Sequence, residues 1–304
     1  MIFSFGFSQE LKFKVHGLEK DTILHLVKYQ SGKLYYADTA EMKKGIVTFD
    51  GAKQHPGLFA LLMPDQTYFD FIYNKEDVFI EVTYPNLMDN LKVKKSNENM
   101  VFFNYIAFMR QSQEEAKILT QEKEALPDGD PQKEGLQNRI LAMGENVKRY
   151  QKSLIAENPG TFVAAMVKMA MDIEIPDAPR NPDGSLVDSA FSYKYFRDHF
   201  FDNIDLTDDR LVRTSIIQKK LEYFMSPQMM IQHPDTLVKY LGAVIDRIPR
   251  GSEMYKFFVV TSSSSFEKSR ISLIRFSSLT MFSLATLIIS VCLSVMGPIL
   301  LLKI

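Results

Sequence analysis

The spacing of the apolar residues changes once along this chain, near Pro85, and this change constrains the fold more than any other feature. Before it, Leu11, Phe13 and Val15 alternate with polar residues, which is the pattern of a strand with one buried face. Turn signals such as Ser31-Gly32 and Pro56-Gly57 separate further runs of this kind. Strands are therefore also predicted at residues 22–29, 33–39, 46–49, 58–62, 68–73 and 78–83.

Short strands at this spacing predict a small antiparallel β-sandwich or open barrel over residues 10–90. Its core is expected to include Phe13, Leu26, Phe49, Leu61 and Phe71. A fold of this kind is more typical of a binding module than of an enzyme.

After Pro85 the apolar spacing becomes helical. A long helix is predicted to end at the breaker 127–131, with one apolar side formed by Phe102, Ile106, Met109, Ala116 and Leu119. The next helix has apolar residues spaced alternately by four and three, which indicates the seam of an antiparallel helix hairpin, with Ile140, Met143, Val147 and Tyr150 buried. Shorter helices are predicted at 161–172, 189–203, 209–225, 235–248 and from 253, and together these form an expected helical domain at 91–261.

Residues 262–304 hold a basic patch followed by an apolar tail. The segment 276–302 carries no charged side chain and is long enough to span a bilayer, so a transmembrane helix is predicted and the membrane is an expected partner through 276–302. Lys268, Arg270 and Arg275 precede the tail and only Lys303 follows it, which places its amino-terminal side in the cytoplasm. The alternative interpretation is a buried core helix. The expected fold class is thus α+β: a small β-sandwich or open barrel, an all-α domain and a C-terminal apolar helix.

The other end of the chain indicates a different compartment. Residues 1–9 hold Ile2, Phe3, Phe5 and Phe7, which resembles the last part of a signal peptide with its cleavage site, although an ordinary first strand explains the residues equally well. Export would place the soluble part on the periplasmic side of the cell envelope. The two ends therefore disagree about the side of the membrane.

Composition excludes several classes of function. The net charge of -1 and the pI near 6.5 give no support to nucleic-acid binding, and no nucleic-acid partner is expected. The only cysteine is Cys292, so the chain can form no internal disulfide and holds neither a CxxC pair nor a cysteine zinc site.

No constellation of residues points to catalysis. The histidines His16, His25, His55, His199 and His233 lack the spacing of metal ligands, and no P-loop, G-x-S-x-G or G-x-G-x-x-G motif occurs. Lys92, Lys94 and Lys95 are interpreted as a solvated connector between domains. No catalytic, cofactor-binding or metal-binding residue is assigned, no cofactor is expected, and the chain is not expected to be an enzyme.

The densest acidic cluster comprises Asp202, Asp205, Asp208 and Asp209. Carboxylate oxygens suit calcium, but the central glycine and the closing glutamate of an EF-hand loop are missing. Helix capping by Thr207 or Asp208 is the preferred interpretation.

Four motifs occur in an order that is typical of one family: VKKSNEN at 93–99, NPGT at 158–161, APRNPDG at 178–184, and YKY at 193–195 running into FDNIDLTDDRL at 201–211. In this arrangement the chain resembles the amino-terminal part of exported thiol:disulfide interchange proteins of the bacterial thioredoxin-like family. The resemblance covers residues 11–260. It implies a small β domain, then a helical domain, both uncharacterised, and last a thioredoxin domain with a CxxC pair.

The chain departs from that family after about Thr261, where the serine run 262–265, the basic patch and the apolar tail replace the expected continuation. We interpret this as a frameshift or rearrangement. The resulting hypothesis is a non-catalytic accessory or recognition region, truncated before its redox domain, which contacts a protein partner through its β or helical domain. The alternative is a membrane-tethered binding protein of the cell envelope.

Overall fold

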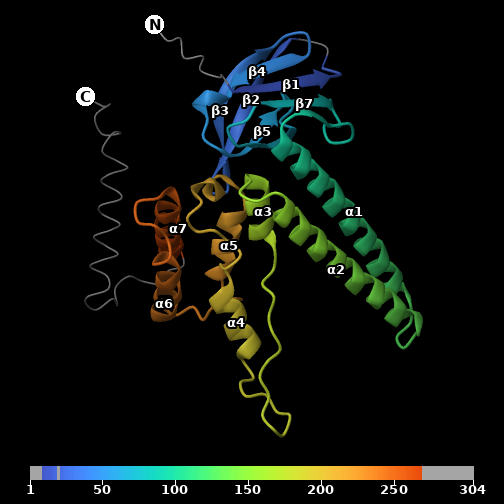
Figure 1. The fold of residues 1–304 in the computed structure, drawn as a ribbon, viewed down its shortest axis with the longest axis vertical. Coiled ribbons are helices and arrows are strands. Elements are labelled where there is room, and N and C mark those ends of the chain that lie inside the picture. The colour runs from blue at the N-terminus through green and yellow to red at the C-terminus, as the bar shows by residue number, and fades with distance from the viewer. Residues whose placement is uncertain (1–8, 19–20, 269–304) are drawn as a thin grey trace. The chain divides into compact units, whose positions relative to one another are not determined.

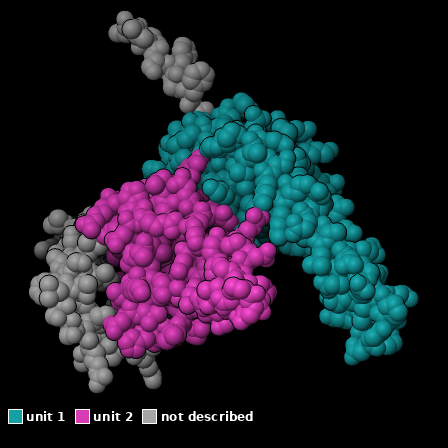
Figure 2. Space-filling view, turned by 60° about the horizontal axis from the view of Figure 1, so that its bottom comes forward, with its two compact units in different colours: residues 1–172, 213–216 teal, residues 173–212, 217–304 magenta. Residues whose placement is uncertain are grey.

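The computed structural model describes residues 9–18 and 21–268, and its fold is α+β, with a β-sandwich followed by helices (Figure 1). The chain forms two compact units, which are coloured separately in Figure 2. Unit 1 contains the described residues up to Asp172 together with Arg213–Ile216. Unit 2 contains Ile173–Val212 and the described residues from Ile217.

The sandwich of unit 1 consists of two four-stranded sheets. The first has the order β4-β1-β7-β8, with β4 at Ile46–Asp50, β1 at Glu10–His16, β7 at Val78–Thr83 and β8 at Lys92–Lys95. The second has the order β3-β2-β5-β6, with β3 at Lys33–Met42, β2 at Thr22–Gln30, β5 at Gly57–Leu62 and β6 at Tyr68–Tyr73. A short 3-10 helix, η1, lies at Gly51–Lys53.

The core lies between the sheets and confirms the residues expected from the alternation. Phe13, Leu26, Phe49, Leu61 and Phe71 are all buried. The Phe13 ring contacts the Phe71 ring edge to face, with centroids 4.9 Å apart. Burying a side chain of this size contributes about 2–3 kcal/mol each, so the alternating pattern supplies most of the drive to form this sandwich.

The sheets are not purely antiparallel, which corrects the prediction of an antiparallel sandwich. Strands β1 and β7 run parallel, with Phe13 opposite Ile80, while the other pairs are antiparallel. Turn signals predict hairpins between neighbours in sequence, but β1 and β7 are separated by most of the domain. The residues near each strand therefore contain no pattern that predicts this parallel pairing.

The lysine-rich segment Lys92–Lys95 forms β8, at the edge of its sheet, and is therefore not the solvated connector that was predicted. Val93 lies opposite Ile80 in the neighbouring strand. The Lys95 ammonium lies 2.7 Å from the Asp77 carboxylate. Lysines on an edge strand hinder pairing with a further chain, which explains a strand with so few apolar residues.

Three helices complete the main part of unit 1: α1 at Asn97–Ala125, α2 at Gln132–Glu157 and α3 at Phe162–Ala170. The first two form the predicted antiparallel hairpin, turning at the Pro127-Asp128-Gly129 breaker. The change from strands to helices thus falls between 83 and 99, as expected, with β8 ending at Lys95.

The seam of this hairpin is less covered than predicted. Ile140, Met143, Val147 and Tyr150 are only partly buried, so the prediction that they are buried is wrong. A heptad spacing shows which side of a helix faces its partner, but full burial needs further neighbours. Leu154 is buried, close to the start of α3, which packs on α2.

Unit 2 is helical. Its elements are α4 at Phe191–His199, the 3-10 helix η2 at Asp209–Arg213, α5 at Ile216–Phe224, α6 at Pro234–Ile245 and α7 at Glu253–Lys268, with the two residues Arg213 and Ile216 assigned to unit 1. An aromatic cluster forms its core, where the Phe201 ring lies 4.8 Å from Phe224 and 5.6 Å from Phe258.

The expected domain ranges 10–90 and 91–261 follow the change in secondary structure, whereas the compact units divide elsewhere. Helices α1 to α3 belong to the same unit as the sandwich. Residues 1–8 and the apolar tail 276–302 lie outside the described residues. Among residues 9–18 and 21–268, no helix combines the length and the apolar character needed to cross a membrane.

Candidate functional site

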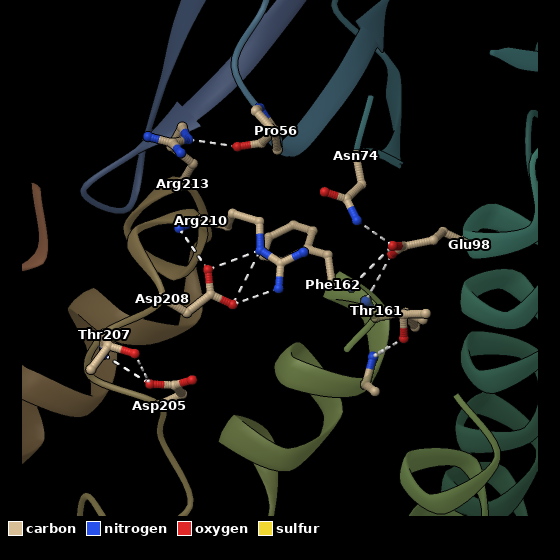
Figure 3. A network of polar contacts seen from close by, with 12 residues as sticks. Pro56, Asn74, Glu98, Thr161, Phe162, Asp205, Thr207, Asp208, Arg210 and Arg213 are labelled. Carbon is tan, nitrogen blue, oxygen red and sulfur yellow. Dashed lines mark hydrogen bonds and ion pairs between the residues drawn. The ribbon is translucent and has the colours of Figure 1, made fainter. Parts of the chain in front are cut away.

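The motif at 93–99 forms a buried polar joint in unit 1. Glu98, in the first turn of α1, is only 7% exposed. Its carboxylate accepts hydrogen bonds from the backbone N–H groups of Phe162 and Val163, both at 3.0 Å, and from the Asn74 amide at 2.5 Å (Figure 3). A helix N-terminus has unsatisfied N–H groups and a partial positive charge, so the carboxylate both satisfies and stabilises the start of α3. We call Glu98, Asn74, Phe162 and Val163 the Glu98 joint.

The neighbouring Asn99 ties α1 to the sandwich. Its fully buried side chain accepts from the Ile72 N–H at 2.8 Å and donates to the Ile72 carbonyl at 2.7 Å. Ser96 caps α1 by accepting from the Asn99 N–H, and its hydroxyl donates to Glu76 at 2.5 Å. Ser96 holds a φ of 133°, a region that side chains rarely adopt, and these bonds fix it there.

The second motif meets the first at the start of α3. Thr161 caps this helix, since its hydroxyl accepts from the Ala164 N–H at 3.3 Å. The first N–H groups of α3 are therefore bonded to residues of both motifs. The residues that carry the family resemblance in unit 1 are caps and joints, and their role is structural.

The four aspartates of the acidic cluster have separate partners in unit 2. Partners include Arg247 and His199 for Asp202, Thr207 for Asp205, Arg210 for Asp208 and the Met254 N–H for Asp209. Asp208 accepts from the Arg210 N–H at 3.0 Å at the start of η2, which confirms the capping interpretation for this residue (Figure 3). In the described part of the chain, no three His, Cys, Asp or Glu side chains are grouped as metal ligands.

Among the described residues, two of the histidines lie within hydrogen-bond distance of a neighbouring side chain. His199 contacts Asp202 at 2.6 Å, and His25 lies 3.0 Å from the Thr39 hydroxyl. Neither pair contains the third group that would orient a general base towards a nucleophile.

Arg213 forms a second joint within unit 1. Its Nε donates to the Pro56 carbonyl at 2.6 Å, across 157 positions of sequence (Figure 3). Gly57 makes this approach possible, because a Cβ added there would lie 2.7 Å from the Arg213 Cβ.

Two hydrogen-bonded residues with shifted pKa values, Tyr29 and Asp70, lie on the outer face of the second sheet. The Tyr29 hydroxyl donates to the Asp70 carboxylate at 3.1 Å. Burial raises the pKa of Asp70 to about 6, although the hydrogen bond from Tyr29 acts in the opposite direction. Burial, followed by the Asp70 charge, also raises the pKa of the Tyr29 hydroxyl. Neither group adjoins a described nucleophile, so this pair is better explained by packing than by catalysis.

Unit 2 contains a groove of about 340 Å³, formed by α4, α6 and the segment between α5 and α6. It is lined by Tyr193, Arg197, Met230, Ile231, Asp235, Thr236, Lys239 and Tyr240. This volume lies at the lower end of the range found for small-ligand sites. We call it the Arg197 groove, and it is the candidate binding site.

Arg197 is held rigidly in this groove. Its guanidinium carbon lies 4.0 Å from the ring centroid of Tyr240 and 5.5 Å from that of Tyr193. The Nε donates to Asp198 at 2.8 Å, and the side chain is only 12% exposed. Tyr193 is itself fixed by its hydroxyl, which donates to the Met229 carbonyl at 2.8 Å. The cation is therefore positioned before any ligand arrives.

The sequence alone does not predict the Arg197 groove. Tyr193 and Arg197 are one helical turn apart in α4, but Tyr240 lies on α6, and no spacing rule links these helices. The only available signal was the YKY motif at 193–195, whose first residue lines the groove.

Comparison with known proteins identifies one domain. Residues 10–102 match a family model described as a domain of unknown function, DUF4369. The match covers the sandwich and the first turns of α1, including Ser96, Glu98 and Asn99. No curated protein and no solved structure matches the chain.

Proposed function

We propose that this chain acts as the non-catalytic recognition region of an exported thiol:disulfide interchange protein of the thioredoxin-like kind. The DUF4369 domain supports the proposal, because this domain is commonly found in thioredoxin-like exported proteins. The motifs at 93–99, 158–161, 178–184 and 193–211 support it further. They resemble the region ahead of the redox domain in that family.

The Glu98 joint is the observation that carries the proposal. Residues from two resembling motifs meet there and use their polar groups in capping and joining, with none presented as a reactive group. A scaffold of this kind positions surfaces for binding. Thiol exchange also requires an attacking thiolate and a second sulfur, and the sequence holds no cysteine before Cys292.

The experiment compares binding with turnover in the full chain. Reduced, carboxymethylated α-lactalbumin serves as an unfolded polypeptide without free thiols, and native α-lactalbumin is the folded control. We expect the chain to bind the unfolded form more tightly, as measured by biolayer interferometry. We also expect no reduction of insulin disulfides in the presence of dithiothreitol above the uncatalysed rate.

A Cys292→Ser variant separates the two parts of the test. It should bind the unfolded polypeptide as the parent does. Disulfide turnover that persists in this variant would contradict the proposed non-catalytic role, and equal binding to folded and unfolded α-lactalbumin would contradict the recognition role.

A second candidate function is a membrane-tethered binding protein of the cell envelope, favoured by the uncharged segment 276–302. The test is membrane fractionation of the full chain against a version ending at Lys268, the last residue of α7. Tethering predicts that only the full chain sediments with membranes. Equal distribution of the two versions would exclude the tether.

A further inference from the structure

The charges of the Arg197 groove point to the chemistry of its ligand. Arg197 uses its Nε for Asp198, and neither terminal guanidinium nitrogen has a hydrogen-bond partner among the described residues. Lys239, on the same groove, has its ammonium 5.4 Å from the ring centroid of Tyr240 and forms no ion pair with the described part of the chain. Two cationic groups thus face the groove with unused donors, and a planar guanidinium matches a carboxylate with two parallel hydrogen bonds.

The other walls limit the ligand further. Ile231 is 74% exposed and offers an apolar contact in the same groove as the cations, whereas its neighbour Met230 is buried. Asp235 also lines the groove and disfavours a ligand with several negative charges. A single carboxylate beside an apolar group satisfies both conditions, whereas a polyphosphate or a nucleic acid does not.

We propose that the Arg197 groove binds a peptide carboxylate, with Arg197 and Lys239 on the carboxylate and Ile231 against an adjacent apolar side chain. The inference rests on the proposed recognition role and names its chemistry. The carboxylate belongs to an acidic side chain or to a peptide C-terminus. These two sources share the same chemistry, and labelled peptides distinguish them.

The test uses the full chain and fluorescein-labelled hexapeptides read by fluorescence anisotropy. The parent peptide is Gly-Ser-Gly-Ser-Leu-Glu with a free C-terminus. One derivative is amidated at the C-terminus, a second replaces Glu by Gln, and a third carries both changes. We expect the doubly changed peptide to bind at least about 10-fold more weakly than the parent, because it has lost its charge-assisted hydrogen bonds. The derivative that binds like the parent identifies which carboxylate is used.

Protein variants test the groove itself. Lys239→Gln and Ile231→Asp change exposed side chains, so both proteins should fold, and each should weaken parent binding several-fold. Arg197→Gln should weaken it about 10-fold or more, and Arg197→Lys should not restore full affinity, because an ammonium lacks the planar fork. Lys219→Gln, an exposed lysine of α5 outside the groove, is the matched control and should bind like the parent.

Equal binding of all four peptides, or unchanged binding by Lys239→Gln and Ile231→Asp, would overturn the proposal. So would a lack of binding to any peptide at millimolar concentration. These failures differ from a failure of the recognition role, because an unused groove would leave binding to unfolded α-lactalbumin unchanged in the same variants.

Discussion

At the scale of single residues, the Glu98 carboxylate receives hydrogen bonds from two segments of unit 1 that are far apart in sequence. The Phe162 N–H is 64 positions away and the Asn74 amide is 24 positions away. A buried carboxylate is stable in a folded protein only when such donors surround it. Replacing Glu98 should therefore destabilise the junction between α1 and α3.

We predict that Glu98→Gln destabilises the protein by about 2 kcal/mol. The variant keeps the size of the side chain but loses the negative charge at the start of α3. Its amide N–H₂ group also replaces one of the accepting oxygens, so that a donor of the variant faces a donor of the joint. Urea unfolding followed by circular dichroism measures the change. Glu114→Gln, an exposed residue of the same helix, is the control and should shift the midpoint little. Equal midpoints for the two variants would contradict the role given to the Glu98 joint.

Asp70 should make stability fall as pH rises. Its pKa is raised from 3.8 to about 6, so between these values the folded state keeps a proton that the unfolded state releases. The contribution of Asp70 to stability is then highest below pH 3.8, declines through the window up to about 6, and stays lower above it. Asp70→Asn removes the cost of ionising a buried carboxyl group and keeps an acceptor for the Tyr29 hydroxyl. We expect it to stabilise the protein by about 1–3 kcal/mol at pH 7 and much less at pH 4.

Urea midpoints of the parent and Asp70→Asn at pH 4, 5, 6 and 7 test this prediction. The exposed Asp89→Asn serves as the control for a change of net charge. A difference between parent and Asp70→Asn that stays the same from pH 4 to pH 7 would mean that Asp70 titrates normally.

The sequence predicts little at this scale. The core residues follow from alternation, because Phe13 and Leu26 need only a strand with one buried face. The role of Glu98 at the start of α3 could not be predicted, because the N–H groups that it binds belong to a helix more than sixty positions away. The four clustered aspartates show the converse, since closeness in sequence did not bring their carboxylates together.

At the scale of elements, the hairpin of α1 and α2 is unevenly supported. Leu154 is 4% exposed, whereas Ile140 lies earlier in α2, nearer the hairpin turn, and is only partly buried. We predict that Leu154→Ala costs about 2–4 kcal/mol and that Ile140→Ala costs about 1 kcal/mol, since truncation costs most where neighbours surround the removed atoms. Thermal unfolding of the two variants measures the difference. A larger cost at Ile140 would show that the far part of the hairpin is better packed than described.

Most elements could be predicted, and the exceptions have physical reasons. Strands β6 and β7 match their predicted bounds because alternation and turn residues agree at both ends. Strand β8 was missed because Lys-Val-Lys-Lys offers one apolar residue and its pairing with β7 is what makes it a strand. The parallel pairing of β1 and β7 depends on residues that are distant in sequence.

At the scale of the whole molecule, unit 1 is assembled from segments far apart in the chain. Arg213 is 8% exposed and bonds to Pro56. We predict that Arg213→Ala destabilises the protein by about 1–3 kcal/mol, because the Pro56 carbonyl loses a charged donor. Urea unfolding measures the change. Arg180→Ala removes an exposed arginine whose side chain donates to the Gly184 carbonyl within its own loop, and it should have little effect. Equal effects of the two substitutions would remove Arg213 from its structural role.

The hydrogen bond between Arg213 and Pro56 also sets an order of events during synthesis on the ribosome. The strands that flank Pro56 emerge early, yet their partner is translated 157 residues later. This bond therefore cannot form until three helices of its own unit and a long stretch of unit 2 have left the exit tunnel. Completion of the amino-terminal unit is thus a late step, and a ribosome pause before Arg213 would hold the nascent chain in a partly assembled state.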